Sequence, residues 1–208
     1  MSLSRGDVAL GVLLSLAGVS QARAEEVMYQ FRTQEDPTKP PDAAVCDAAP
    51  FVATVKLGAS VYIPLHRPQD GKVVYEGQRR AGTATACLRI TDPTFPPGQQ
   101  VPAHFRFNLP DGTFTATGAC TLVSNDVPEP RLVLGGCALK LVEFPEGFKG
   151  GMVSSTSIFN PAKLPGYATG SFYTLHAYRD DKAKDARARK QDREEREAAV
   201  KTEAKVDK

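Results

Sequence analysis

Apolar residues alternate with polar ones most regularly around a Pro-Asp-Gly motif near the middle of the chain. Before the motif, Phe105, Phe107 and Leu109 alternate with polar residues. After the motif, Phe114 resumes the apolar side. A period of two is typical of a strand with one buried face. Pro110-Asp111-Gly112 contains residue types that favour a tight turn, so the pattern predicts a β-hairpin.

Similar short strand patterns recur along the chain, separated by clusters of Pro, Gly and Asp. The predicted strands are 27–31, 51–57, 60–65, 73–75, 82–90, 104–109, 113–117, 132–142, 152–159 and 167–178, with a bulge or bend at Gly135-Gly136 in the eighth. No amphipathic helical pattern precedes residue 179. Short strands with frequent turns predict an all-β fold, either a single antiparallel β-barrel of about eight strands or a sandwich.

Small residues inside the strands favour the barrel over the sandwich, because strongly bent strands need them where they coil. These residues are Ala84, Ala86, Ala116, Gly118 and Gly135.

The first 24 residues have the pattern of a signal peptide. An apolar run spans residues 8–19, and Ala22-Arg23-Ala24 supplies small residues where a signal peptidase cleaves. The run is shorter than the ~20 residues of a membrane-spanning helix, although an N-terminal anchor is the alternative. We therefore expect export to the periplasm or outside the cell, a mature chain starting at Glu25, and no membrane span once the signal is removed.

The last 30 residues, 179–208, form a highly charged tail after the predicted β-barrel domain, 25–178. The tail contains 11 basic and 9 acidic residues and no apolar stripe that could dock on the domain. It is predicted to be helical or disordered and solvated, with a partner-binding helix as the alternative.

Four cysteines follow the export signal, and an even number in an oxidising compartment predicts two disulfides. Cys120 and Cys137 share strand faces with apolar residues, so both point inward on strands that a short loop could make neighbours. Cys87 lies on the face opposite Leu88, and Cys46 lies in an irregular segment. We therefore predict Cys46–Cys87 and Cys120–Cys137, out of three possible connectivities. The spacing contains no Cys-x-x-Cys pair, so no metal site is expected.

Charge and motifs give little support for catalysis or for nucleic-acid binding. Residues 25–178 contain 13 basic and 14 acidic residues, which leaves no basic surface for nucleic acid. The three histidines, His66, His104 and His176, lack a catalytic or metal-binding spacing, and structural roles are expected for them. Ser154, Ser155 and Ser157 lack a nucleophile motif. We expect no catalytic residue and no cofactor, and no ligand-binding residue is assigned.

Tyrosines on the predicted strands could line a cavity with their polar tips, although packing at the edge of the core is the commoner role. The candidates are Tyr62, Tyr75, Tyr167, Tyr173 and Tyr178.

Several short motifs between residues 73 and 178 resemble the small barrel of allene oxide cyclases and plant dirigent proteins. They are the strand from Gly82 to Cys87, the segment FNLPDGTFTATG at 107–118, Leu134-Gly-Gly136, Phe148-Lys-Gly-Gly151 and a closing apolar strand. Those families have Gly-Gly-Thr-Gly where this chain has Gly-Gly-Cys. The resemblance implies an antiparallel eight-stranded barrel with an apolar cavity, often in oligomers. No catalytic residue of those families matches this chain.

The sequence favours a non-enzymatic function: an exported, disulfide-bonded barrel that binds a small apolar or amphipathic ligand, or a structural module of the cell envelope. One alternative is an enzyme of the cyclase or isomerase kind that uses the barrel cavity. Another is an interaction protein that recruits a partner through its charged tail. A cavity of about 300 Å³ or more with a buried acid or Arg would favour the enzyme.

Overall fold

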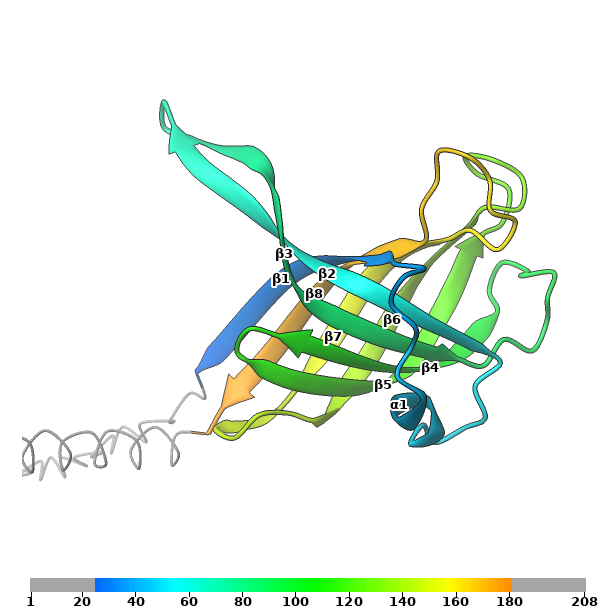
Figure 1. Cartoon of the computed structure of the whole chain (residues 1–208), viewed down its shortest axis with the longest axis horizontal. Coiled ribbons are helices and arrows are strands. Elements are labelled where there is room, and N and C mark those ends of the chain that lie inside the picture. Colours follow the sequence, from blue (N-terminus) through cyan, green and yellow to red (C-terminus); the bar gives the residue numbers. More distant parts are fainter. Residues whose placement is uncertain (1–24, 181–208) are drawn as a thin grey trace, which may run out of the picture.

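The computed structural model describes residues 25–180, which form a closed antiparallel β-barrel of eight strands (Figure 1). The strands follow one another around the barrel in chain order, and β8 closes the ring by pairing with β1. They are β1 (Glu26–Glu35), β2 (Val55–Gln69), β3 (Lys72–Leu88), β4 (Gln100–Leu109), β5 (Gly112–Ser124), β6 (Val133–Glu143), β7 (Phe148–Phe159) and β8 (Gly170–Arg179).

The predicted fold class is therefore confirmed, and the barrel replaces the sandwich alternative. The predicted signal peptide, residues 1–24, lies outside the described residues. So does the predicted tail from residue 181 onward, while Arg179 is the last residue of β8.

The hairpin around Pro110-Asp111 is present as predicted. Phe107 on β4 pairs with Phe114 on β5, and both side chains are fully buried inside the barrel. Gly112 begins β5 with a φ of 131°, a value that L residues rarely adopt, which explains why the turn ends in glycine.

The three strands predicted at 60–65, 73–75 and 82–90 are parts of two long strands, β2 and β3. The inner parts of these strands belong to the barrel: β2 pairs with β1 over Ala59–Tyr62, and β3 pairs with β4 over Thr83–Leu88. Beyond these segments β2 and β3 pair only with each other. Residues 63–81 therefore project from the barrel as a two-stranded arm, seen at the upper left of Figure 1.

Two further predictions are wrong in detail. The strand predicted at 51–57 begins only at Val55, and a short helix, α1 (Ala43–Asp47), lies in the connection where no helix was predicted. Asp42 caps α1 by accepting a hydrogen bond from the Ala44 amide at 3.0 Å. A helix of five residues is too short to show an apolar period, so the sequence pattern could not reveal it.

The irregularity predicted as a bulge or bend at Gly135-Gly136 is not a bulge of β6 itself, because β6 runs through both glycines in regular pairing with β7. The irregularity lies on the neighbouring strand β5, where the register shifts between Leu122 and Ser124. A Cβ atom on Gly136 would lie 2.7 Å from the backbone oxygen of Ser155. The glycine is therefore explained by the close approach of two strands, one of the uses of glycine within strands.

A small apolar cluster covers part of the outer face of the barrel. Val45 and Cys46 of α1 pack against Cys87 of β3, and all three are buried. The disulfide Cys46–Cys87 joins α1 to the barrel wall, and Cys120–Cys137 joins the paired strands β5 and β6. These are the two predicted disulfides, and they leave no free cysteine among the described residues.

Candidate functional site

The two ends of the barrel differ in their connections and in their packing. At one end the chain turns tightly at residues 110–111 and 144–147, and the interior is filled by aromatic and aliphatic side chains. We call this region the packed half, and its main residues are Tyr29, Phe107, Phe114, Leu141 and Phe148. At the other end the connections are long, at 36–54, 89–99, 125–132 and 160–169.

The interior at the end with the long connections contains a cavity of about 100 Å³, and we call this region the hollow half. Most of its wall is apolar. The apolar side chains are Leu57, Ala59, Ala86, Leu88, Ile90, Phe95, Val101, Phe105, Leu122, Val133, Ile158 and Phe159, together with the Cys120–Cys137 disulfide.

The cavity exists because small residues occupy inward positions that larger side chains fill elsewhere. Ala59 and Ala86 line it from β2 and β3, and Gly135 lines it from β6. A Cβ atom on Gly135 would lie 2.7 Å from the backbone oxygen of Thr121, so that position does not readily accept a side chain. The cavity is therefore kept open by the close approach of the strands at Gly135 as well as by the small side chains of Ala59 and Ala86.

One wall of the cavity carries a row of hydroxyl groups, the hydroxyl strip, formed by Thr33, Ser157, Ser171 and Tyr173. These residues come from three neighbouring strands, β1, β7 and β8. The Ser171 hydroxyl donates to the Ser157 oxygen at 2.8 Å. A ligand in the hollow half would therefore meet apolar groups on most sides and hydrogen-bonding groups on one side.

Tyr173 is the titratable residue of the hydroxyl strip, and its side chain is buried. Burial raises the pKa of its phenol to about 12, although hydrogen bonds with the Ser171 and Thr33 hydroxyls act in the opposite direction. The phenol is therefore neutral at every ordinary pH. It can donate or accept a hydrogen bond inside the barrel, but it does not serve as an anionic base near neutral pH.

The mouth of the cavity is framed by two phenyl rings and one carboxylate. Phe95, from the β3–β4 connection, packs edge to face on Phe159 with 5.6 Å between ring centroids. Phe95 has a φ of 54°, an unusual left-handed conformation for a bulky residue. Glu35 is exposed at the rim and is the charged member of the described lining.

Hydrogen bonds within and between the connections hold the rim in place. The buried Asn160 side chain donates to the backbone oxygens of Leu164 and Tyr167, each at 2.9 Å. Asn125 donates to the Thr94 oxygen at 3.2 Å, which ties two connections together. A ligand site with such a rim is largely formed before the ligand arrives.

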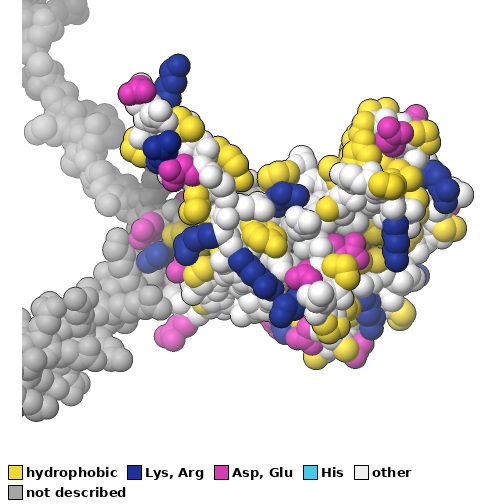
Figure 2. Space-filling model, turned by 45° about the horizontal axis from the view of Figure 1, so that its top comes forward, with side chains coloured by type: hydrophobic (Ala, Val, Ile, Leu, Met, Phe, Trp, Pro, Cys, Tyr) yellow, Lys and Arg dark blue, Asp and Glu magenta, His cyan; other side chains and the backbone are white. Residues whose placement is uncertain are grey.

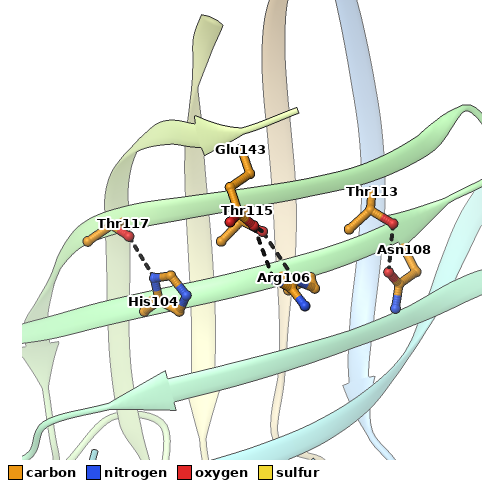
Figure 3. Close-up of polar contacts among 7 residues, drawn as sticks. All are labelled: His104, Arg106, Asn108, Thr113, Thr115, Thr117 and Glu143. Carbon is orange, nitrogen blue, oxygen red and sulfur yellow. Dashed lines mark hydrogen bonds and ion pairs between the residues drawn. The ribbon is translucent and has the colours of Figure 1, made fainter. Parts of the chain in front are cut away.

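A second set of polar side chains lies on the outer face of the barrel, on β4, β5 and β6 (Figure 3). His104, Arg106 and Asn108 alternate along β4, and each meets a threonine of β5 directly across the strand pair. The His104 Nδ1 atom lies 2.7 Å from the Thr117 hydroxyl, and Arg106 lies 3.0 Å from Glu143. These are cross-strand pairs of the kind that stabilise a sheet.

His104 faces away from the Phe side of the hairpin, as expected, and is buried on the outer face. Burial lowers the pKa of its imidazole, while the Glu143 charge acts in the opposite direction. Its Nε2 atom has no hydrogen-bond partner among the described residues. His104 does not line the cavity, so we assign it to the packing of the outer face.

The structure does not bring the three histidines together. His66 is in the arm, where its ring packs against Tyr75 with 5.9 Å between centroids. His176, on β8, pairs with Glu26 on β1. Within residues 25–180 there is no cluster of three or more side chains suited to hold a metal ion.

Among the five candidate tyrosines, Tyr173 lines the cavity, and among the three candidate serines, Ser157 does so. Sequence reasoning missed Thr33 and Ser171. Both have the inward parity of their strands. The first strand is predicted to end at Phe31, four residues before the end of β1 at Glu35, so the prediction leaves Thr33 outside any strand. Ser171 lies within the predicted strand 167–178, but nothing in its local sequence marks it as a lining residue. Tyr75 instead borders an open groove of about 590 Å³ between the arm and the outer face of the barrel.

Comparison with known proteins found no matching family model, no matching curated protein and no matching solved structure. No helix within the described part of the chain is long and apolar enough to cross a membrane.

Proposed function

We propose that this protein is an exported barrel that binds a small, mainly apolar ligand in the hollow half, with one hydrogen-bonding group of the ligand facing the hydroxyl strip. Two disulfides in an all-β domain are compatible with export. The observation that carries the proposal is the apolar cavity with hydroxyl groups on one wall. Ligand sites commonly combine an apolar lining with a few placed polar groups.

The size of the cavity limits the ligand. About 100 Å³ is below the range of roughly 300–1,000 Å³ found for drug-sized ligands. An engineered apolar cavity of roughly 150 Å³ binds benzene. The ligand, or the part of it that enters the barrel, is therefore about the size of one small ring or a short branched chain.

The same features favour binding over catalysis. The described lining contains no Arg, and its carboxylate, Glu35, is exposed at the rim rather than buried. The neutral Tyr173 phenol orients a polar group but supplies no charge. The resemblance to allene oxide cyclases and dirigent proteins supports an apolar barrel cavity. Because no catalytic residue of those families matches this chain, the resemblance does not support the alternative of a cyclase or isomerase.

The test uses two probes of nearly equal shape, toluene and phenol, titrated into the mature chain, residues 25–208, and followed by amide NMR shifts. We expect both to shift the amides of Leu122, Gly135 and Ser157. The double variant Thr33→Val, Ser171→Ala should weaken phenol binding about fivefold, in line with the loss of neutral hydrogen bonds, and leave toluene binding unchanged.

The matched control is Thr121→Val on the outer face, where the threonine accepts a hydrogen bond from Gln100. It should change neither affinity. Equal weakening of both probes by the double variant would contradict the role of the hydroxyl strip. Shifts confined to the groove beside Tyr75 would contradict the cavity as the site.

A further inference from the structure

The arm has two outer edges, and their sequences differ. On β2, Pro64 and Pro68 interrupt the edge, and proline cannot donate a backbone hydrogen bond to an added strand. On β3, residues 72–81 contain no proline and include the strand-forming segment Val73-Val74-Tyr75. Natural sheets commonly block an exposed edge with proline, so proline blocks one edge of the arm and not the other.

The β3 edge of the arm is unpaired and carries apolar side chains. β3 pairs with β4 only from Thr83 onward, and within residues 25–180 no backbone hydrogen bond joins residues 72–81 to a segment other than β2. Val73 is 76% exposed and Tyr75 is 58% exposed. Figure 2 shows hydrophobic side chains interleaved with charged ones on the arm.

The backbone of this edge is oriented for strand addition. Gln69 and Lys72 flank the two-residue turn at Asp70-Gly71, and such a flanking pair exchanges hydrogen bonds across the hairpin. Because orientation alternates along a strand, Val74 also bonds toward β2. The N–H and C=O groups of Val73 and Tyr75 then point away from β2, toward the free edge.

The charge pattern of the segment Lys72-Val-Val-Tyr-Glu76 is complementary to itself in the antiparallel direction. Aligned about Val74, two copies place each Lys72 opposite the partner's Glu76 and each Val73 opposite the partner's Tyr75. Opposite charges in directly facing positions stabilise a strand pair. Alignments centred on Val73 or Tyr75 instead place Val74 against Lys72 or Glu76, so one register is favoured.

We propose that the β3 edge of the arm is a homodimerisation site, where a second copy of this chain adds its own β3 edge antiparallel, in the register centred on Val74. The two arms then form a continuous four-stranded sheet with Val73 and Tyr75 of both copies on one face. This contact is isologous, the form that a two-fold symmetric dimer requires. It is separate from the cavity and does not depend on the proposed ligand.

The contact between arms is short, so the dimer is weak. Interfaces at the low end of the size range are typical of transient association. Sedimentation velocity of the mature chain, residues 25–208, should show reversible dimers at about 0.1 mM and monomers at about 1 µM, the range between weak and moderate affinities. A monomer at every concentration up to about 1 mM would overturn the proposal.

Charge reversal gives the sharper test. Lys72→Glu alone and Glu76→Lys alone each place like charges opposite one another twice, and each should weaken association about tenfold. A 1:1 mixture of the two variants restores both attractive pairs in a mixed dimer. Association of the mixture well above that of either variant supports the register, and a mixture no better than its components would overturn it.

Glu76 also forms an ion pair with Arg67 at 2.7 Å, so Glu76→Lys could disturb the arm itself. A Val74→Cys variant therefore tests the register independently. Residues facing each other in a non-hydrogen-bonded antiparallel pair have Cα atoms about 4.5 Å apart, close enough for a disulfide. Val74→Cys should form a covalent dimer on mild oxidation far more rapidly than Val73→Cys, and equal rates would contradict the register.

Discussion

The packed half and the hollow half of the barrel are built by the same eight strands but differ in the size of their inward side chains. In the packed half, Phe114 is fully buried between Tyr29 and Phe148, each with 5.5 Å between ring centroids. In the hollow half, Ala86 and Gly135 take equivalent inward positions beside a cavity of about 100 Å³. The difference indicates that one end of the interior holds the fold together, while the other is available to a ligand.

The largest expected effect comes from truncating an aromatic ring in the packed half. Phe114→Ala should lower the free energy of unfolding by about 3–5 kcal/mol, because it removes buried contacts and leaves a cavity. The matched variant Phe159→Ala, at the partly exposed rim, should cost about 2 kcal/mol or less for the same reason. Urea unfolding of the two variants measures both values. Equal losses would contradict the division into two halves.

An added side chain should have opposite consequences in the two halves. Ala116 is fully buried in the packed half, so Ala116→Leu should destabilise the fold by about 1–3 kcal/mol through overpacking. Ala86 borders the cavity, so Ala86→Leu should change stability by less than about 1 kcal/mol. Thermal and urea unfolding test the pair, and a large loss in Ala86→Leu would show that the space is not available.

The smallest effect is a loss of stability in alkali that depends on Tyr173. Its pKa is raised to about 12 in the folded chain, above the ordinary value of 10, so its contribution is complete below pH 10 and is lost as the pH rises toward 12. At pH 11 the loss should be about 1 kcal/mol, since one pKa unit corresponds to about 1.4 kcal/mol. Tyr173→Phe should lack this component, and identical alkaline profiles for both proteins would count against a buried phenol.

The sequence predicted the barrel because period-two patterns and turn residues are local signals. The hairpin at Pro110-Asp111 and the inward parity of Cys120 and Cys137 both came from such patterns, and the structure contains both. The arm could not be predicted, because neither strand shows locally where it leaves the barrel. That point is set by pairing with β1 and β4, which are distant in the chain.

The candidate site was only partly predictable. Tyr173 is one of five tyrosines considered for a cavity lining, but packing at the edge of the core was the favoured role, and the sequence does not separate Tyr173 from the other four. Thr33 and Ser171 look like ordinary strand residues, and their importance comes from lying beside Tyr173 on the paired strands β1 and β8. Whether an alternating strand faces a filled or a hollow interior depends on side chains contributed by all the other strands.

Toluene binding to Ala86→Leu tests the central claim most directly. The added isobutyl group would occupy the cavity, while the arm and the outer face of the barrel stay unchanged. We expect binding to weaken at least tenfold relative to the unsubstituted chain, since burying the probe supplies roughly 25 cal/mol per Å² of apolar area. Unchanged toluene affinity in a folded Ala86→Leu variant would show that the hollow half is not the binding site.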